Sequence, residues 1–186
     1  MTARGHRPVP AVSSKETRSR PSSVLPPGIT PSLAHKILVE NVRFAATELQ
    51  SAGLRLPIEP VNSRDIPGFL LDDSQQALEI IAEVGSGNLL LQQDIYHMQV
   101  MEGDLAGTIT ENLSRIGYVQ IADNPGRHEP GTGEINYTFL FEALDRERYT
   151  GWIGCDYNAL SSPVPGSAGP PTIRLQLTIS EPRATR

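Results

Sequence analysis

Short apolar runs alternate with amphipathic segments through the middle of this chain, and this alternation constrains the fold more than any other feature. Four runs have the length and apolar content of buried strands: 54–59, 88–94, 118–123 and 151–156. Four segments have apolar residues at helical spacing: 33–52, 74–84, 102–115 and 137–149. Continuous apolar strands that alternate with helices predict a parallel sheet with both faces buried. The predicted fold class is therefore α/β.

Turn and cap residues support these boundaries. Gly53, Gly85 and Gly117 follow three of the helical segments, and glycine commonly ends a helix. Ser74 is the expected N-cap of the second helix. No strand is followed by a GxGxxG turn or a phosphate-binding loop, which disfavours a dinucleotide-binding Rossmann domain. The pattern instead favours a piece of a (β/α) barrel.

Polar residues stand at or near the end of every predicted strand. They are Glu59, Asp94, Gln120 and Asp156, and they are separated by 35, 26 and 36 residues. Each interval fits one helix plus one strand, so we expect the four side chains to face one mouth at the carboxyl ends of the strands. Each residue alone could be a helix cap or a surface charge. As a set of oxygen ligands, they predict a site for a hard divalent cation, Mg²⁺ or Mn²⁺.

The loop 124–136 is long and polar and contains three glycines, which is typical of a binding loop or lid. Arg127 and His128 could hold an anionic substrate, although a solvated surface loop has a similar composition. His97 follows Asp94 by three residues and could either line the site or be structural. Trp152 and Cys155 lie in an apolar run and are predicted to pack in the core.

Composition excludes several classes of function. The net charge of −5 argues against nucleic-acid binding as the main activity. No apolar run approaches the roughly 18 residues of a membrane span. The single cysteine excludes an internal disulfide and a cysteine-rich zinc site, and it suits the reducing cytoplasm. We therefore expect a cytoplasmic protein that binds neither nucleic acid nor membranes.

The two ends differ in composition from the middle. Residues 1–31 are basic and rich in Pro and Ser, which predicts a disordered extension; a transit peptide is the alternative, but the prolines would break its helix. Residues 158–186 form a Pro-rich, irregular tail, in which 173–179 alternate between apolar and polar like a strand. The globular domain is thus expected at 32–157.

Four stretches resemble the hydroxypyruvate isomerase family, within the xylose isomerase-like barrel superfamily. They are IEPVNSRDIPGF (58–69), LLLQQDIYHMQVMEGDL (89–105), YVQIADNPGRHEPGTGEINYTFLF (118–141) and GWIGCDY (151–157). The long NPGRHEPGTGEINY loop makes the resemblance specific. It implies that the domain is a partial (β/α)8 TIM-type barrel, comprising about its last four β/α units.

The resemblance also implies residue roles. Glu59 resembles a metal ligand and one of two acid/base carboxylates, and Asp94 and Gln120 resemble further ligands. His97 and Arg127 match positions near the substrate. Asp156 resembles the second acid/base group and fourth ligand, although the family motif has Glu there, as in GCEY, and Asp is one methylene shorter.

The implied reaction is a metal-dependent interconversion of hydroxypyruvate and 2-hydroxy-3-oxopropanoate, an aldose–ketose type isomerisation. A related sugar or sugar-acid isomerase or epimerase, such as a 2-oxo-tetronate isomerase, is an alternative. A truncated, inactive remnant is another. A half barrel would expose two sheet edges, so a homo-oligomer is expected.

Overall fold

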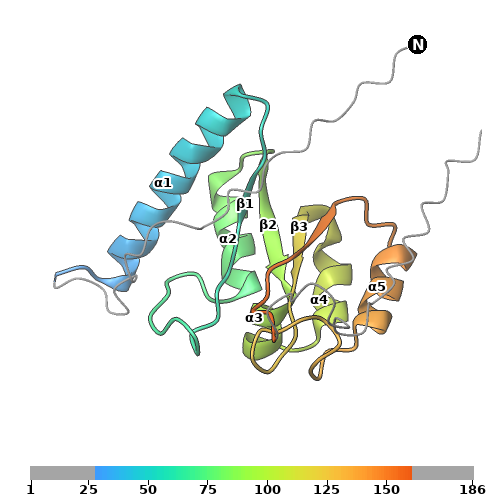
Figure 1. Ribbon diagram of the computed structural model, residues 1–186. Coiled ribbons are helices and arrows are strands. Elements are labelled where there is room, and N and C mark those ends of the chain that lie inside the picture. The colour runs from blue at the N-terminus through green and yellow to red at the C-terminus, as the bar shows by residue number, and fades with distance from the viewer. Residues whose placement is uncertain (1–27, 161–186) are drawn as a thin grey trace, which may run out of the picture.

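The computed structural model describes residues 28–160 (Figure 1). In chain order, the elements are α1 (Pro31–Ser51), β1 (Leu56–Ile58), α2 (Ser74–Val84), β2 (Leu89–Asp94), α3 (Ile95–Met101), α4 (Leu105–Asn112), a 3₁₀ turn η1 (Leu113–Arg115), β3 (Ile116–Ile121), α5 (Tyr137–Arg146) and β4 (Trp152–Cys155). The four strands are all parallel and lie in the order β1-β2-β3-β4. The predicted parallel α/β sheet is confirmed, but the prediction that both faces are buried is wrong: β1 and β4 contain exposed residues, and buried and half-buried residues alternate in the first part of β2.

The core lies between the sheet and its helices. Figure 1 shows α1 beside α2 on one side of the molecule and α4 beside α5 on the other, with the strands between these two pairs. Leu91 and Val119 are fully buried on the central strands, and they belong to the same apolar cluster as Ile80 of α2 and Ile109 of α4. The central strands β2 and β3 are therefore held by hydrogen bonds to a strand on each side and by packing against the helices.

Local sequence explains where the helices begin and end. Thr30 caps α1 by accepting a hydrogen bond from Leu33 N. Asp73 caps α2, so the prediction that Ser74 is the N-cap is wrong by one residue; Ser74 is instead the first residue of the helix. Asp73 is the N-cap because its carboxylate Oδ1 accepts a hydrogen bond of 2.6 Å from Gln76 N. Gly85 ends α2 with φ 70°, a left-handed conformation that favours glycine.

The predicted helix at 102–115 is only partly correct. A short helix, α3, begins directly after β2, and a second helix, α4, begins at Leu105. Gly103 and Asp104 lie between them with φ values of 67° and 40°, which no continuous helix can accommodate. The first helix was missed because it has no loop before it: the residue that ends the strand, Asp94, is also the residue that caps the helix.

The prediction that Trp152 and Cys155 pack in the core is wrong. Trp152 is 66% exposed and Cys155 is exposed. Among the described residues, β4 has a neighbouring strand on one side only, because it pairs with β3 at the edge of the sheet. An apolar run predicts a buried strand only where other elements cover it. The strand-like segment 173–179 and the extension 1–27 lie outside the described residues.

Among residues 28–160, no helix has both the length and the apolar character needed to cross a bilayer.

Candidate active site

The carboxyl ends of β1 and β2 bring two acidic residues together. Glu59 directly follows β1, and Asp94 is the last residue of β2, which pairs with β1. Burial raises the pKa of Glu59 to about 8, and the neighbouring charge of Asp94 adds to this rise. Burial also raises the pKa of Asp94, against the opposing effect of His97 and Arg127. Two carboxyl groups so close and so poorly solvated favour either a shared proton or a bound cation.

Asp94 has two oxygens with different environments. Its Oδ1 accepts a hydrogen bond of 3.1 Å from His97 N and so caps α3. Its Oδ2 is buried and has no hydrogen-bond partner among the described residues. Arg127 Nη2 lies 3.6 Å and His97 Nε2 lies 3.9 Å from this oxygen. A buried carboxylate oxygen without a hydrogen bond is costly unless a further group binds it, and a proton shared with Glu59 or a metal ion is such a group.

Glu59, Asp94 and His97 form a cluster that could hold a metal ion. Each offers one ligand atom, and these atoms all lie within 4.8 Å of one another. His97 is 2% exposed, and burial lowers its pKa below the usual value. The residues therefore fit a divalent cation by their chemistry, with the buried oxygens as its ligands.

The other two predicted ligands lie in an adjoining hydrogen-bonded chain. Gln120 Nε2 donates to Asp156 Oδ2 at 2.7 Å, and Gln120 Oε1 accepts from Gln92 Nε2 at 2.6 Å. Gln120 sits opposite Asp94 in the register of β2 and β3. Asp156 does not belong to the three-residue cluster, but Arg127 links it to Asp94. Gln120 Oε1 has a second lone pair, which could bind a cation while the hydrogen bond from Gln92 is kept.

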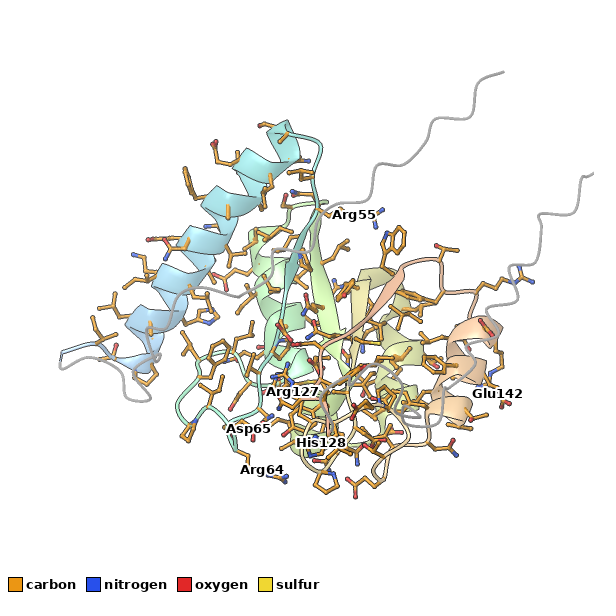
Figure 2. All side chains as sticks on the ribbon, viewed as in Figure 1. Arg55, Arg64, Asp65, Arg127, His128 and Glu142 are labelled. Atoms are coloured by element: carbon orange, nitrogen blue, oxygen red, sulfur yellow. The ribbon has the colours of Figure 1, made fainter. Side chains whose placement is uncertain are left out.

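Arg127 connects the loop 124–136 to the strand ends. Its Nη2 lies 2.7 Å from Asp156 Oδ2 and 3.6 Å from Asp94 Oδ2, and its guanidinium lies 5.6 Å from the centre of the Tyr96 ring. Arg127 also has φ 55°, an uncommon conformation for a residue with a side chain. His128 Nδ1 contacts Asn158 O at 2.8 Å. Figure 2 shows Arg127, His128, Arg64 and Asp65 gathered at the same end of the molecule.

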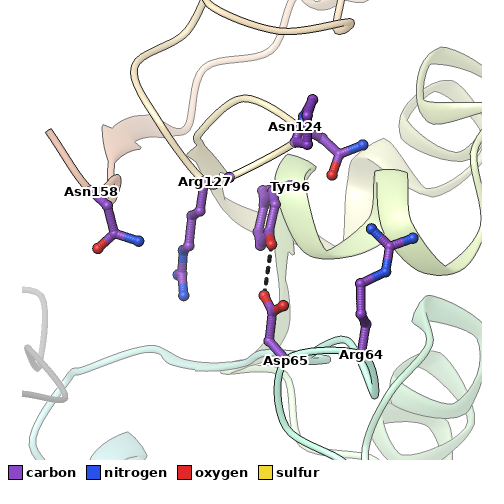
Figure 3. A pocket seen from close by; sticks show the side chains of 8 residues that line it. Arg64, Asp65, Tyr96, Asn124, Arg127 and Asn158 are labelled. Atoms are coloured by element: carbon purple, nitrogen blue, oxygen red, sulfur yellow. Dashed lines mark hydrogen bonds between the residues drawn. The ribbon is translucent and has the colours of Figure 1, made fainter. Parts of the chain in front are cut away.

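A cavity of about 540 Å³ opens beside Arg127. Arg64, Asp65, Tyr96 and Asn158 also line it (Figure 3). Two arginines at its wall favour an anionic ligand, since a guanidinium pairs well with a carboxylate.

Sequence reasoning missed several residues that shape this site: Asn62, Arg64, Asp65, Tyr96 and Asp123. Asp123 is fully buried, and its carboxylate accepts hydrogen bonds from the backbone N–H groups of Asn124, Gly131 and Ile135. It therefore holds the loop that carries Arg127. The position of Asp123 at the end of the predicted strand 118–123 was the one available signal.

Comparison with known proteins places this arrangement in a family. The family described as "Xylose isomerase-like TIM barrel" matches residues 19–174. The chain belongs to this family. The expectation of a partial TIM-type barrel is thereby confirmed, and the xylose isomerase-like family explains why the polar residues gather at the carboxyl ends of the strands.

Relatives within the xylose isomerase-like family include named isomerases. Hydroxypyruvate isomerase of Escherichia coli (strain K12) is 52% identical over 132 residues, which cover 71% of this chain and 51% of that protein. A 2-oxo-tetronate isomerase of Cupriavidus necator is 46% identical over 119 residues, which cover 64% of this chain and 46% of that protein. The chain therefore spans about half the length of the curated relatives it matches.

A solved structure shows the same proportion. The structure titled "AP endonuclease, family 2" from Brucella melitensis aligns with a TM-score of 0.70 and 37% identity, covering 73% of this chain and 53% of that chain. The four described strands thus correspond to about half of a xylose isomerase-like barrel.

Proposed function

We propose that this chain carries the catalytic half of a divalent-metal-dependent isomerase that interconverts hydroxypyruvate and 2-hydroxy-3-oxopropanoate. The observation that supports this most is the pairing of Glu59 with the buried Asp94 at the carboxyl ends of adjacent parallel strands, where Asp94 Oδ2 accepts no hydrogen bond from an N–H or hydroxyl group of the described residues. The 52% identity to the Escherichia coli hydroxypyruvate isomerase supports the choice of reaction.

Glu59, Asp94, Gln120 and Asp156 are the proposed metal ligands. Their oxygens suit Mg²⁺ or Mn²⁺ better than softer ions. When bound, such an ion would polarise the substrate oxygens and stabilise the negative charge that develops during the reaction.

The side chains of this chain supply the proton transfers. Glu59 has a pKa near 8 in the ion-free site, so it can exchange a proton close to neutral pH. We assign to it the removal of a proton from the hydroxymethyl carbon of hydroxypyruvate. A proton is returned to the neighbouring carbonyl carbon, and Asp156 is the proposed partner for this step. The hydroxyl proton moves to the former ketone oxygen, so that the hydroxymethyl carbon becomes the aldehyde and the ketone carbon carries the new hydroxyl group. Arg127, which lines the cavity, would hold the substrate carboxylate, and His97 would contact a substrate oxygen.

A second candidate is a 2-oxo-tetronate isomerase, because the Cupriavidus necator relative of that name is 46% identical. The same ligand set would serve either substrate. The purified chain should therefore be assayed with both 2-oxo acids in the presence of Mg²⁺ and of Mn²⁺. Turnover of hydroxypyruvate with the higher kcat/KM supports the first proposal, and the reverse ranking favours the second. Absence of turnover together with absence of Mn²⁺ binding would contradict both and would favour an inactive remnant.

We also propose that the 186-residue chain self-associates in the cytoplasm. Among the described residues, β1 and β4 each have a strand on one side only, and unpaired strand edges favour pairing with another chain. Sedimentation at micromolar concentration should show a species of at least twice the monomer mass. A single monomeric species over the whole concentration range would contradict this.

A further inference from the structure

Asn62 is a buried side chain to which neither the fold nor the proposed reaction gives a role so far. It lies in the segment that follows β1, is 0% exposed, and contacts His97 on α3. Its motif, EPVNSRD, contributes Glu59 to the candidate metal cluster. Asn62 therefore joins the loop after one site strand to the helix after the next.

Two groups of Asn62 approach the same nitrogen of His97. The backbone N of Asn62 lies 3.3 Å from His97 Nδ1, and the side-chain Nδ2 lies 2.6 Å from it. A backbone N–H can only donate a hydrogen bond. If Nδ1 carried a proton, that proton would face the N–H of Asn62, so Nδ1 must accept.

The amide orientation of Asn62 supports the same conclusion. Its Oδ1 accepts a hydrogen bond of 2.7 Å from Asp65 N, and its Nδ2 lies 3.1 Å from Asp65 Oδ2. Exchanging the two amide atoms would place an NH₂ group against the N–H of Asp65 and an oxygen against its carboxylate. The NH₂ group therefore faces His97.

Asp65 is itself held in place. The hydroxyl of Tyr96 donates to Asp65 Oδ2 at 2.7 Å, as the dashed line in Figure 3 shows. Tyr96 precedes His97 on α3, so the chain of contacts runs from the helix to Asp65, then to Asn62, and back to the helix. This closed arrangement leaves the amide little freedom to turn.

We propose that Asn62 is a positioning residue that fixes His97 in the neutral tautomer with its proton on Nε2, so that His97 acts as a hydrogen-bond donor in the site and not as a metal ligand. A protonated ring nitrogen has no lone pair to offer an ion. Nε2 is the nitrogen that faces the cluster, 3.9 Å from Asp94 Oδ2. The metal would then bind the oxygens, and Nε2–H would be available to a substrate oxygen. The catalytic part of this proposal rests on the proposed isomerase function; the tautomer does not.

The tautomer can be measured without any activity. ¹⁵N–¹H correlation spectra of the ion-free protein report which ring nitrogen of each histidine is protonated, and a His97→Gln variant identifies the His97 signals. We expect His97 Nδ1 to be unprotonated and Nε2 to be protonated at pH 7.5. The same state should persist when Mg²⁺ is added. A protonated Nδ1 in the parent, or loss of the Nε2 proton on addition of Mg²⁺, would overturn the proposal.

Substitution tests the role of Asn62 directly. Asn62→Asp replaces the donor with an acceptor, so it should draw the His97 proton to Nδ1, whereas Asn112→Asp on α4 should leave the His97 signals unchanged. A misplaced group in a catalytic site can cost up to roughly 100-fold in rate. We expect the kcat of Asn62→Asp to fall by a factor of this size, while its Mn²⁺ affinity changes less than about threefold.

A His97 tautomer that is unchanged in folded Asn62→Asp would contradict the role of Asn62. If the variant does not fold, the spectra of the parent still decide the tautomer. Should no isomerase activity exist at all, the spectra would still stand, so the two proposals can fail separately.

Discussion

Arg127 Nη2 lies 2.7 Å from Asp156 Oδ2, and this ion pair joins the loop after β3 to the end of β4. The Asp156 side chain is 59% exposed, so the pair is solvated and can exchange partners at small energetic cost. Arg127 thus neutralises the carboxylate that the proposed reaction assigns to the metal and to a proton transfer. A cation that binds at Asp156 would compete with the guanidinium.

Restoring the longer carboxylate at position 156 should strengthen the site. In Asp156→Glu, the additional methylene lets the carboxylate extend further toward the cluster. A shift of about 1 Å in a catalytic group can change the rate by up to roughly 100-fold. We therefore expect Mn²⁺ affinity or isomerase activity to rise by about tenfold. Calorimetry and initial rates measure the two quantities. Asp145→Glu on the exposed face of α5 is the matched control. Unchanged or lower values would mean that the site has adapted to aspartate or does not use it.

Removing the charge of Asp94 should abolish metal binding while the fold remains. Asp94→Asn keeps an oxygen that can cap α3, but it removes the charge of a buried carboxylate that lies beside Glu59. We expect Mn²⁺ affinity to fall by at least about 100-fold, since one charged ligand is lost. Titration calorimetry measures the loss, and circular dichroism checks the helices. Glu142→Gln on α5, labelled in Figure 2 apart from the site, should bind Mn²⁺ like the parent.

Metal binding should release a proton from Glu59. Its pKa near 8 means that the carboxyl group is mostly protonated at pH 7 in the ion-free protein, and a ligand must be ionised. We expect about one proton released per Mn²⁺ at pH 7, with affinity that rises up to tenfold per pH unit until pH 8. Calorimetry in two buffers of different ionisation enthalpy measures the release. Equal proton release in Glu59→Gln would exclude Glu59 as its source.

The same group sets a pH dependence of stability with a defined sign. The pKa of Glu59 is about 8 when folded and about 4.5 in an unperturbed carboxyl group. Between these values the folded state binds more protons than the unfolded state, so the free energy of unfolding should fall as pH rises from 4.5 to 8. Denaturant titrations of the ion-free protein at pH 5 and 8 measure the decrease. Glu59→Gln should show a smaller decrease than the parent, and an identical one would contradict the raised pKa.

Asp123 should contribute strongly to stability. Its buried carboxylate accepts three backbone N–H groups of the loop, and Asp123→Asn would replace one acceptor oxygen with an NH₂ group that opposes them. We expect the free energy of unfolding to fall by about 3 kcal/mol, from the usual value of hydrogen bonds to charged groups. Urea denaturation measures this. The exposed Asp145→Asn should change stability by less than about 0.5 kcal/mol, and a similarly small effect of Asp123→Asn would show that the loop is held by other contacts.

The layout of the sheet and the proximity of Glu59 to Asp94 could be predicted from the sequence because both follow from the spacing of strand ends. Glu59 and Asp94 lie where parallel strands bring their carboxyl ends together, and this geometry is independent of side-chain detail. The exposure of Trp152 could not be predicted in this way, since burial of a strand depends on which neighbours cover it.

The supporting residues were not predictable for a different reason. An asparagine in a loop, such as Asn62, is typical of an ordinary turn, and only the folded structure shows that its amide contacts His97. The helix α3 was missed because its N-cap is hidden inside the preceding strand. In both cases one residue has two roles, and a pattern of residue types along the chain reveals only one of them.

The two oxygens of Asp94 have a consequence for how such a site can evolve. One oxygen caps a helix and the other lies in the group formed with Glu59 and His97 that could hold a metal ion, so most replacements at this position would weaken the helix cap and the proposed ligand set together. A lineage that lost the need for the reaction would still be under selection to keep a capping residue here. Aspartate at this position is therefore weak evidence that a descendant remains active. Asparagine preserves the cap and removes the charge, so it would indicate a protein that has kept its fold and lost its catalytic activity.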